Sequence, residues 1–202
     1  MKKILLAVIA ISLVVMAGCS KPPEAEMAAA QSAINNVKAA EAEQYVPQAF
    51  RMLTDSLNAA MAMKTEQDGK FALFRSYGES KAMFERVTGM TADVINQANA
   101  EKERVKQEVT GMMAEAKGLL DSAMVLLGKA PMGKDNKAEL ELIKNDLTNL
   151  GSEFTVAEGD FNGGKYLVAR TKIESIKSRV MNITAEICKA YEAKGKKCPM
   201  GM

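Results

Sequence analysis

The residues best suited to chemistry in this chain are its three cysteines, Cys19, Cys188 and Cys198. A cysteine sulfur can act as a nucleophile, bind a soft metal or form a disulfide. The sequence has no histidine, which removes the commonest general base and the commonest zinc ligand. No convergent carboxylate pair, activated nucleophile or phosphate-binding loop stands out. We therefore expect no catalytic residues, no cofactor and no enzymatic activity.

The first cysteine ends a segment with the layout of an export signal. Lys2 and Lys3 open it, an apolar run from Ile4 to Met16 is broken only by Ser12, and small residues follow. A charged region, an apolar region and a small-residue cleavage site occur in this order in secretory signal peptides. The apolar run is too short to cross a bilayer, which takes about 20 apolar residues.

The residues Met16-Ala17-Gly18-Cys19 resemble a bacterial lipobox, with Met where Leu is commonest. The resemblance implies that a signal peptidase recognises Met16, Ala17 and Gly18 and removes residues 1–18. It also implies that Cys19 carries acyl chains on its sulfur and on its new amino terminus. Ser20 in place of Asp resembles an outer-membrane sorting signal of Gram-negative bacteria. The alternative is an ordinary signal peptide, or a membrane anchor, with a cysteine there by chance.

The other two cysteines lie close together near the C-terminus. In an oxidising compartment we expect Cys188 and Cys198 to form a disulfide that pins a tail, residues 193–202, to the last helix. Together with Met200 and Met202, the same cysteines could offer soft ligands for Cu(I). Because a disulfide would consume both thiols, we expect no metal site.

The composition favours helices and argues against a nucleic-acid partner. Loss of Lys2 and Lys3 leaves 25 of 27 basic residues against 25 acidic ones, so the mature chain is formally neutral. Nucleic-acid binders usually show a clear basic excess. The chain has no Trp and only 5% aromatic residues, while Ala, Met, Lys and Glu, which favour helices, are abundant.

Apolar residues at steps of three and four predict a series of helices. The first runs from Met27 to Gln44 and ends at Tyr45-Val46-Pro47, and the second ends near Gly69. A third region starts around Lys70 and has no strong stop before residues 128–133. Two further helices follow, separated by a turn at residues 158–164. We predict an all-α fold of antiparallel helical hairpins, packed as a coiled-coil-like, elongated bundle.

Within the third region, the aromatic residues Phe71, Phe74, Tyr77 and Phe84 suggest an apolar face at its start. A heptad pattern begins at Ile95 and is interrupted by one polar residue, which is typical of coiled coils; its members are Ile95, Ala98, Lys102, Val105, Val109, Met112, Ala116, Leu119, Ala123 and Leu126. We expect a bend at one of the glycines, most plausibly Gly89.

These elements suggest a division of the chain. We expect a lipidated tether at residues 19–26, an N-terminal helical hairpin unit at 27–90, a three-helix antiparallel unit at 91–192 and the pinned tail. The two hairpins also show similar residues 90 positions apart (147 − 57 and 159 − 69): Leu57 and Leu147, and Gly69 and Gly159. This offset suggests a repeated hairpin, although any two amphipathic helices align to some degree.

A longer pattern resembles a known family. The residues AAEAEQYVPQAF at 39–50, with Leu53, Leu57 and Ala60 and then DGKF at 68–71, are similar to proteobacterial envelope lipoproteins of the uncharacterised "domain of unknown function 4398" family. The similarity covers roughly residues 24–90. Val46 departs from the Ala usual before the proline. The family implies a helical fold and no known activity.

We therefore expect a non-enzymatic envelope lipoprotein that serves as a structural or docking module. Its partners would be the lipid bilayer, through the acyl chains of Cys19, and an unidentified envelope protein, without nucleic acid. It would lie at the periplasmic face of the outer membrane. The alternative is a binding protein for a small apolar or lipidic ligand held between the helices.

Overall fold

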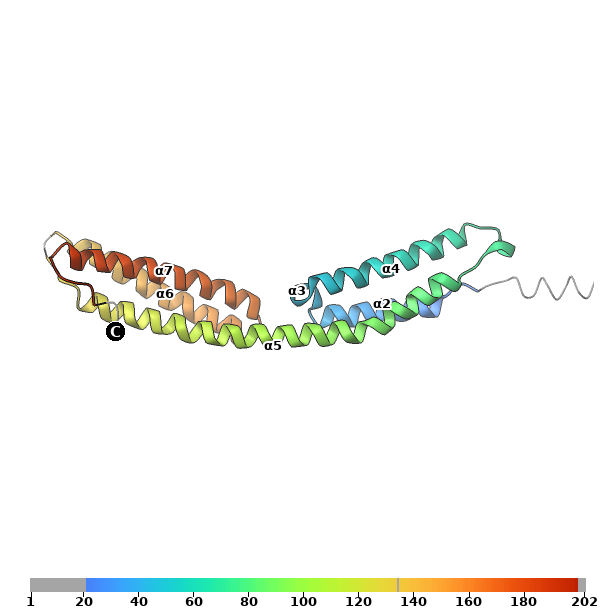
Figure 1. The fold of residues 1–202 in the computed structure, drawn as a ribbon, viewed down its shortest axis with the longest axis horizontal. Coiled ribbons are helices and arrows are strands. Elements are labelled where there is room, and N and C mark those ends of the chain that lie inside the picture. Colours follow the sequence, from blue (N-terminus) through green and yellow to red (C-terminus); the bar gives the residue numbers. More distant parts are fainter. Residues whose placement is uncertain (1–20, 134, 200–202) are drawn as a thin grey trace, which may run out of the picture. The chain divides into compact units, whose positions relative to one another are not determined.

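The computed structural model describes residues 21–133 and 135–199 (Figure 1). Within these ranges the fold is all-α, as predicted, and contains no strand. Its elements are the helices α2 (Glu24–Ala39), α3 (Ala42–Tyr45), α4 (Pro47–Asp68), α5 (Gly78–Gly128), α6 (Lys137–Asn162) and α7 (Tyr166–Glu192), and the short 3-10 helix η1 (Ala72–Phe74).

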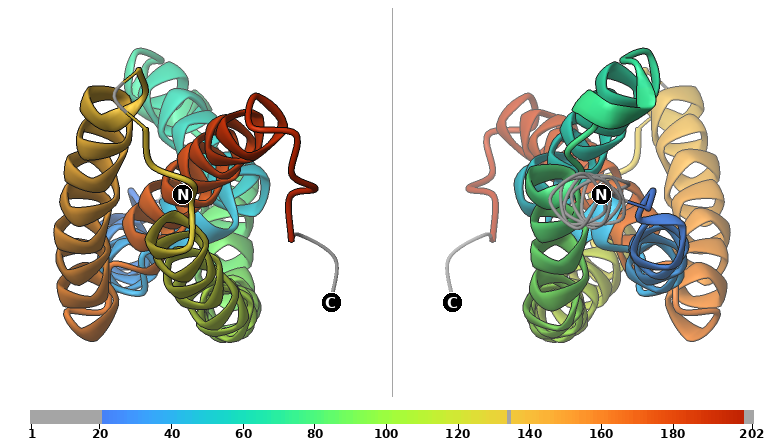
Figure 2. Two further views of the ribbon diagram at one scale, coloured as in Figure 1. Left: turned by 90° about the vertical axis from the view of Figure 1, so that its left-hand side faces the viewer. Right: turned by 90° about the vertical axis from the view of Figure 1, so that its right-hand side faces the viewer.

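The described chain divides into two compact units between Glu101 and Lys102. This division falls within α5, so that one helix of 51 residues supplies a core segment to each unit. The expected boundary at residue 90 lies earlier in the same helix. Each unit is a helical bundle with its own apolar core. In Figure 2 the helices are seen end on, with those of the second unit nearer the viewer on the left and those of the first unit nearer on the right.

In the first unit, α2 and α4 pack against the N-terminal part of α5. Their spaced apolar residues form one buried cluster, which contains Ala30, Ile34, Val37, Ala42, Leu53, Leu57, Ala60, Phe84, Val87, Val94 and Ala98. The helix α2 starts at Glu24, three residues before the expected start at residue 27, and Pro23 is buried directly before it. Residues 24–26, expected in the tether, thus belong to this helix.

The expected first helix is interrupted. Its two parts, α2 and α3, are separated by Ala40 and Glu41, and Glu41 adopts a left-handed conformation with φ of 58°. Such a conformation costs a non-glycine residue about 1–2 kcal/mol. The turn redirects the chain so that Ala42 and Tyr45 are buried, and this burial offsets the cost. The break at Val46 and the start of α4 at Pro47 agree with the prediction.

In the second unit, α6 and α7 form a hairpin that packs against the C-terminal part of α5. The buried cluster contains the residues of α6 that recur at steps of three and four and the isoleucine-rich face of α7. Those of α6 are Leu140, Ile143, Leu147, Leu150 and Phe154. From α5 it takes the heptad residues Ala116, Ala123 and Leu126. The heptad pattern thus correctly indicates the buried face of α5 in this unit.

The predicted start of the third helical region, around Lys70, is wrong. Residues 71–77 are not α-helical, and α5 begins only at Gly78. Phe71 and Phe74, expected on a buried face, are 69% and 75% exposed, whereas Tyr77 and Phe84 are buried. The glycine at position 69 ends α4, and the following aromatic residues belong to the connection rather than to the core.

Two glycines were expected to mark a bend or a turn. The helix α5 is continuous through Gly89, so this glycine does not break the helix. The helix α6 continues through Gly159 to Asn162, so the turn occupies only residues 163–165. Gly69 therefore follows a helix, while Gly159 lies inside one. The turn of the suggested repeat is not shared, although Leu57 and Leu147 are both buried.

The packing of the second core predicts a large contrast between two leucines of α6. Leu150 is fully buried, whereas Leu142 is 64% exposed. Replacing a buried leucine with alanine removes apolar contacts and leaves a cavity, so Leu150→Ala should lower the free energy of unfolding by about 2–5 kcal/mol. Leu142→Ala should change it by less than about 0.5 kcal/mol. Urea denaturation followed by circular dichroism measures both, and equal effects would contradict this assignment of the core.

Candidate functional site

Two predicted sites lie outside the described residues. They are the signal-peptidase recognition site, Met16, Ala17 and Gly18, and the lipidation site, Cys19. The structure does describe where the chain following them enters the fold. It also describes both cysteines of the predicted disulfide and a small hollow near the end of α5.

The chain enters the first unit at the end where three helices meet. The Glu24 carboxylate lies 2.9 Å from Lys64 Nζ on α4, and the Glu26 carboxylate lies 2.9 Å from Lys81 Nζ on α5. The hydrogen bond from Lys81 lowers the pKa of Glu26. The first turn of α2 is thus attached to the last part of α4 and to the first turn of α5.

A polar cluster closes the same end of the unit. Asp68, the last residue of α4, accepts hydrogen bonds from the Tyr77 hydroxyl and from Lys64 Nζ. Both bonds lower the pKa of Asp68, and the bond from Tyr77 contributes more than the bond from Lys64. The same contact raises the pKa of Tyr77. Because every member is bonded to another and the bond from Tyr77 to Asp68 spans the α4–α5 connection, we interpret the cluster as a structural clamp rather than a catalytic group.

The second unit has a comparable clamp at its α6–α7 turn. Asp160 contacts Nζ of Lys172 on α7 and lies 3.8 Å from Lys165 Nζ. The hydrogen bond from Lys172 lowers the pKa of Asp160. Neither clamp was predicted. An acid near a helix end, followed further along the chain by a hydrogen-bond donor such as Tyr77 or Lys172, could have suggested them. That pattern is common in any pair of charged helices.

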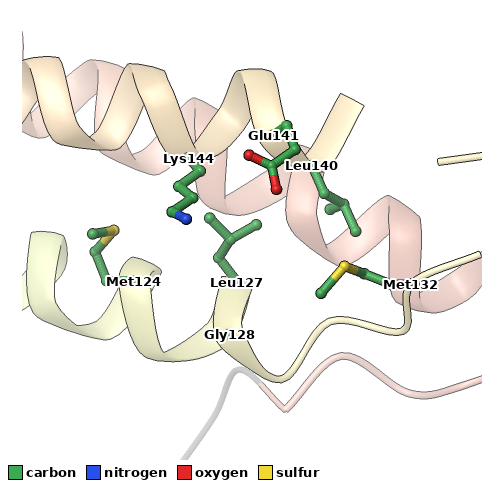
Figure 3. A pocket seen from close by; sticks show the side chains of 7 residues that line it. All are labelled: Met124, Leu127, Gly128, Met132, Leu140, Glu141 and Lys144. Atoms are coloured by element: carbon green, nitrogen blue, oxygen red, sulfur yellow. The ribbon is translucent and has the colours of Figure 1, made fainter. Parts of the chain in front are cut away.

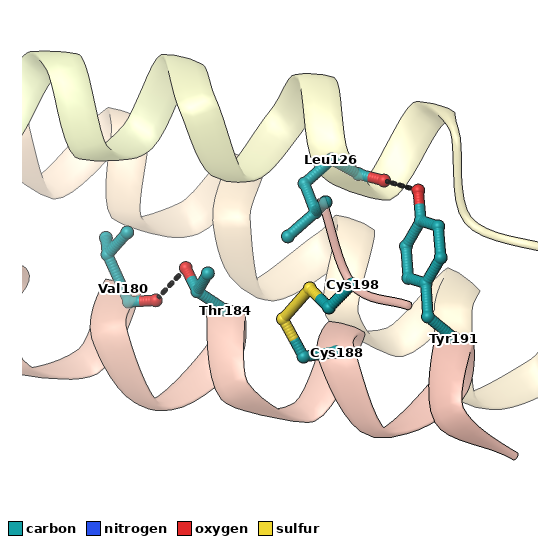
Figure 4. The surroundings of a disulfide bond; sticks show 6 residues. All are labelled: Leu126, Val180, Thr184, Cys188, Tyr191 and Cys198. Atoms are coloured by element: carbon teal, nitrogen blue, oxygen red, sulfur yellow. Dashed lines mark hydrogen bonds between the residues drawn. A yellow bond between two sulfur atoms is a disulfide. The ribbon is translucent and has the colours of Figure 1, made fainter. Parts of the chain in front are cut away.

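The structure brings the two C-terminal cysteines together (Figure 4). Cys188 on α7 and Cys198 in the tail form a disulfide, with their Cα atoms 5.1 Å apart. Both side chains pack against the core of the second unit. Nearby, the buried Tyr191 hydroxyl donates a 3.0 Å hydrogen bond to the carbonyl oxygen of Leu126 on α5. The disulfide and this bond together hold the end of α7 and the tail against the bundle.

A small hollow lies where α5 ends and α6 begins (Figure 3). It has a volume of about 210 Å³ and is lined by Met124, Leu127, Gly128, Met132, Leu140, Glu141 and Lys144. Small-molecule sites in proteins usually measure about 300–1,000 Å³. Among residues 21–133 and 135–199, no group of three or more His, Cys, Asp or Glu side chains could hold a metal ion.

The chain matches no protein-family model, and no curated protein or solved structure is significantly similar to it. The resemblance to the envelope lipoprotein family therefore stays a prediction. In the described part of the chain, none of the helices combines the length and the apolar character needed to span a membrane.

The clamp at Asp68 predicts a pH-dependent stability. An acid whose pKa is lowered by folding stabilises the fold above its ordinary pKa, about 3.9 for Asp, and this contribution is lost as the pH falls through the lowered value. Asp68→Asn should therefore flatten the acid side of the pH–stability curve. The exposed Asp55 on the same helix supplies the control, Asp55→Asn. Chemical denaturation across acidic pH values measures both, and an unchanged curve for Asp68→Asn would contradict the role of the clamp.

The disulfide predicts a modest and local stabilisation. It closes a loop across a sequence separation of 10 residues, for which the loop-entropy model gives about 3 kcal/mol at most. The double substitution Cys188→Ser and Cys198→Ser should lower the free energy of unfolding by about that amount or less. Protease digestion should then release the tail first. The single substitution Tyr191→Phe is a control that removes the neighbouring hydrogen bond while leaving the disulfide. Tail cleavage at the wild-type rate in the double variant would contradict the pinning role.

Proposed function

We propose that this protein is a lipid-anchored, non-enzymatic component of a bacterial cell envelope that presents its helical units to another envelope protein. One observation carries the proposal: the order of Lys2 and Lys3, the apolar run and the Met16-Ala17-Gly18-Cys19 motif at the start of the chain. Two or three acyl chains on Cys19 would hold the protein stably on a bilayer, whereas one chain gives only marginal binding.

The short connection between anchor and fold supports this proposal. Only residues 20–23 separate Cys19 from Glu24, the first residue of α2, and the five residue steps from Cys19 to Glu24 span about 18 Å at most. Pro22 and Pro23 restrict the connection further. The first unit would therefore stay next to the membrane, and this confinement would raise its effective concentration for neighbouring proteins.

Filled cores and exposed helix faces favour docking over ligand binding. Both cores contain large side chains that are fully buried, such as Phe84 in the first and Ile173 in the second. Leu142 and Val156 on α6, by contrast, are 64% and 56% exposed. Val168 and Met181 add exposed apolar surface on α7. Protein interfaces commonly use such residues, although scattered exposed ones are also normal on any surface. The hollow beside Met124 is smaller than usual ligand sites, which weighs against the alternative of a binding protein for an apolar ligand.

The proposed location is the periplasmic face of the outer membrane, because Ser20 rather than Asp follows the lipidated cysteine. The proposed partners are the bilayer and an envelope protein. The formally neutral mature chain supports the absence of nucleic acid among them.

Membrane fractionation combined with crosslinking tests the proposal. The full chain should partition with outer-membrane vesicles, whereas the Cys19→Ser chain should be recovered in the soluble fraction. A photo-crosslinking residue at Leu142 or Val156 should capture one defined envelope protein from the anchored chain. The yield should fall at least tenfold from the Cys19→Ser chain, because the effective concentration is lost. Equal fractionation and equal capture by both chains would contradict the proposal.

A further inference from the structure

The connection between α4 and α5 exposes an unusual amount of apolar surface. Phe71, Leu73 and Phe74 are 69%, 50% and 75% exposed. All three lie within four residues, and the two phenylalanine rings are 6.3 Å apart between their centroids. We name residues 71–74 the aromatic tip. Large apolar side chains clustered in this way on a surface usually indicate an interaction site.

Hydrogen bonds between the end of α4 and the residues that follow the aromatic tip hold the tip in its exposed position. Arg75 donates hydrogen bonds of 2.9 Å to the carbonyl oxygens of Lys70 and Asp68. The Ser76 amide donates a 3.1 Å hydrogen bond to the Gln67 side chain, and Tyr77 is buried. Because both sides of the connection are fixed to the ends of the helices, the exposure of the phenylalanines follows from the fold.

The aromatic tip lies at the end of the first unit where the chain arrives from its N-terminal segment (Figure 1). Glu24 and Glu26, at the start of α2, pair with Lys64 and Lys81, which flank the connection on α4 and α5. Cys19 precedes Glu24 by five residues, a reach of about 18 Å at most. An acyl-bearing Cys19 would therefore bring a bilayer to this end of the unit.

We propose that the aromatic tip inserts into the interfacial layer of the same bilayer that holds the acyl chains of Cys19. This inference rests on the proposed lipid anchor. The occupant of the apolar surface is the lipid itself: the rings and Leu73 enter the acyl boundary. The flanking Lys70 and Arg75, held by Glu66 and by backbone carbonyl oxygens, stay at the level of the headgroups. The acyl chains and the tip together would attach the first unit at two points and fix its orientation on the membrane.

The surrounding charges show that apolar contact, rather than attraction to anionic lipid, would drive insertion. Lys70 pairs with Glu66 at 3.0 Å, and Lys64 and Lys81 are paired with the carboxylates of α2. These three lysines are each paired with an acid, and Arg75 is bonded to backbone carbonyl oxygens. Insertion should occur in neutral phosphatidylcholine vesicles and should not weaken in high salt.

The chain contains no Trp, so a single introduced Trp reports its own surroundings. The test uses the full lipidated chain with Phe74→Trp, reconstituted in phosphatidylcholine vesicles that carry bromine on the acyl chains. The matched control is Met52→Trp, at a position on α4 that is 63% exposed and lies 16 residues, or about 24 Å, before the end of this helix at Asp68. Circular dichroism checks that both variants keep the helical fold.

We expect bromine to reduce the emission of the Phe74→Trp chain at least twofold and to leave that of the Met52→Trp chain unchanged, at low and at high salt. Emission that aqueous acrylamide quenches equally in both vesicle-bound chains would overturn the inference while leaving the anchor intact. A Trp at position 74 that is shielded from acrylamide but not quenched by bromine would also overturn it, because a protein surface or a second copy would then cover the tip. A chain that lacks acyl groups and does not float with vesicles would overturn the proposed function and this inference together.

Discussion

Burial of one apolar stripe along each helix is the constraint on which this structure depends. An isolated helix gains little stability in water, and most helical stability in proteins comes from packing of an amphipathic face. The helix α5 shows this dependence most clearly, because its 51 residues supply Phe84 and Val87 to one core and Ala116 and Ala123 to the other. The short helices and the long one are stabilised in the same way, because each buries the apolar face of its neighbours.

Polar contacts then fix where each helix ends. Asp68 with Tyr77, and Asp160 with Lys172, bridge the connections of the two units. Both acids lie at or near a helix C-terminus, where the helix dipole alone would disfavour a negative charge. Tyr77, directly before α5, and Lys172 on α7 are the partners that make those positions favourable. The ends of the units are therefore determined by pairs that join consecutive helices, while the middles are determined by apolar packing.

The sequence predicted the helical segments well because the three-and-four spacing of apolar residues depends only on local geometry. Every expected core residue of α6, from Leu140 to Phe154, is buried. The prediction failed where a glycine was taken to mark the end of a helix. Gly159 lies inside a helix, since burial of its neighbours Phe154 and Ala157 outweighs a helix penalty of about 1 kcal/mol. Gly69 does mark an end, and only the fold shows that Phe71 and Phe74 beyond it face outward.

The candidate site could be predicted only in part. The pairing of Cys188 with Cys198 followed from their number and position, and the structure places them within bonding reach. The contacts of Glu24 with Lys64 and of Glu26 with Lys81 depend on how α2 packs, which no local pattern specifies. Under the proposed function, these contacts fix which end of the first unit would face a membrane.

The central claim is that Cys19 joins this helical protein to a bilayer. Mass spectrometry of the N-terminal peptide of the mature protein tests it most directly. The account predicts a peptide that begins at Cys19 and carries a diacylglyceryl group on its sulfur, with a further acyl chain on its amino group. A peptide that begins at Met1, or a mature chain with an unmodified Cys19 thiol, would contradict it.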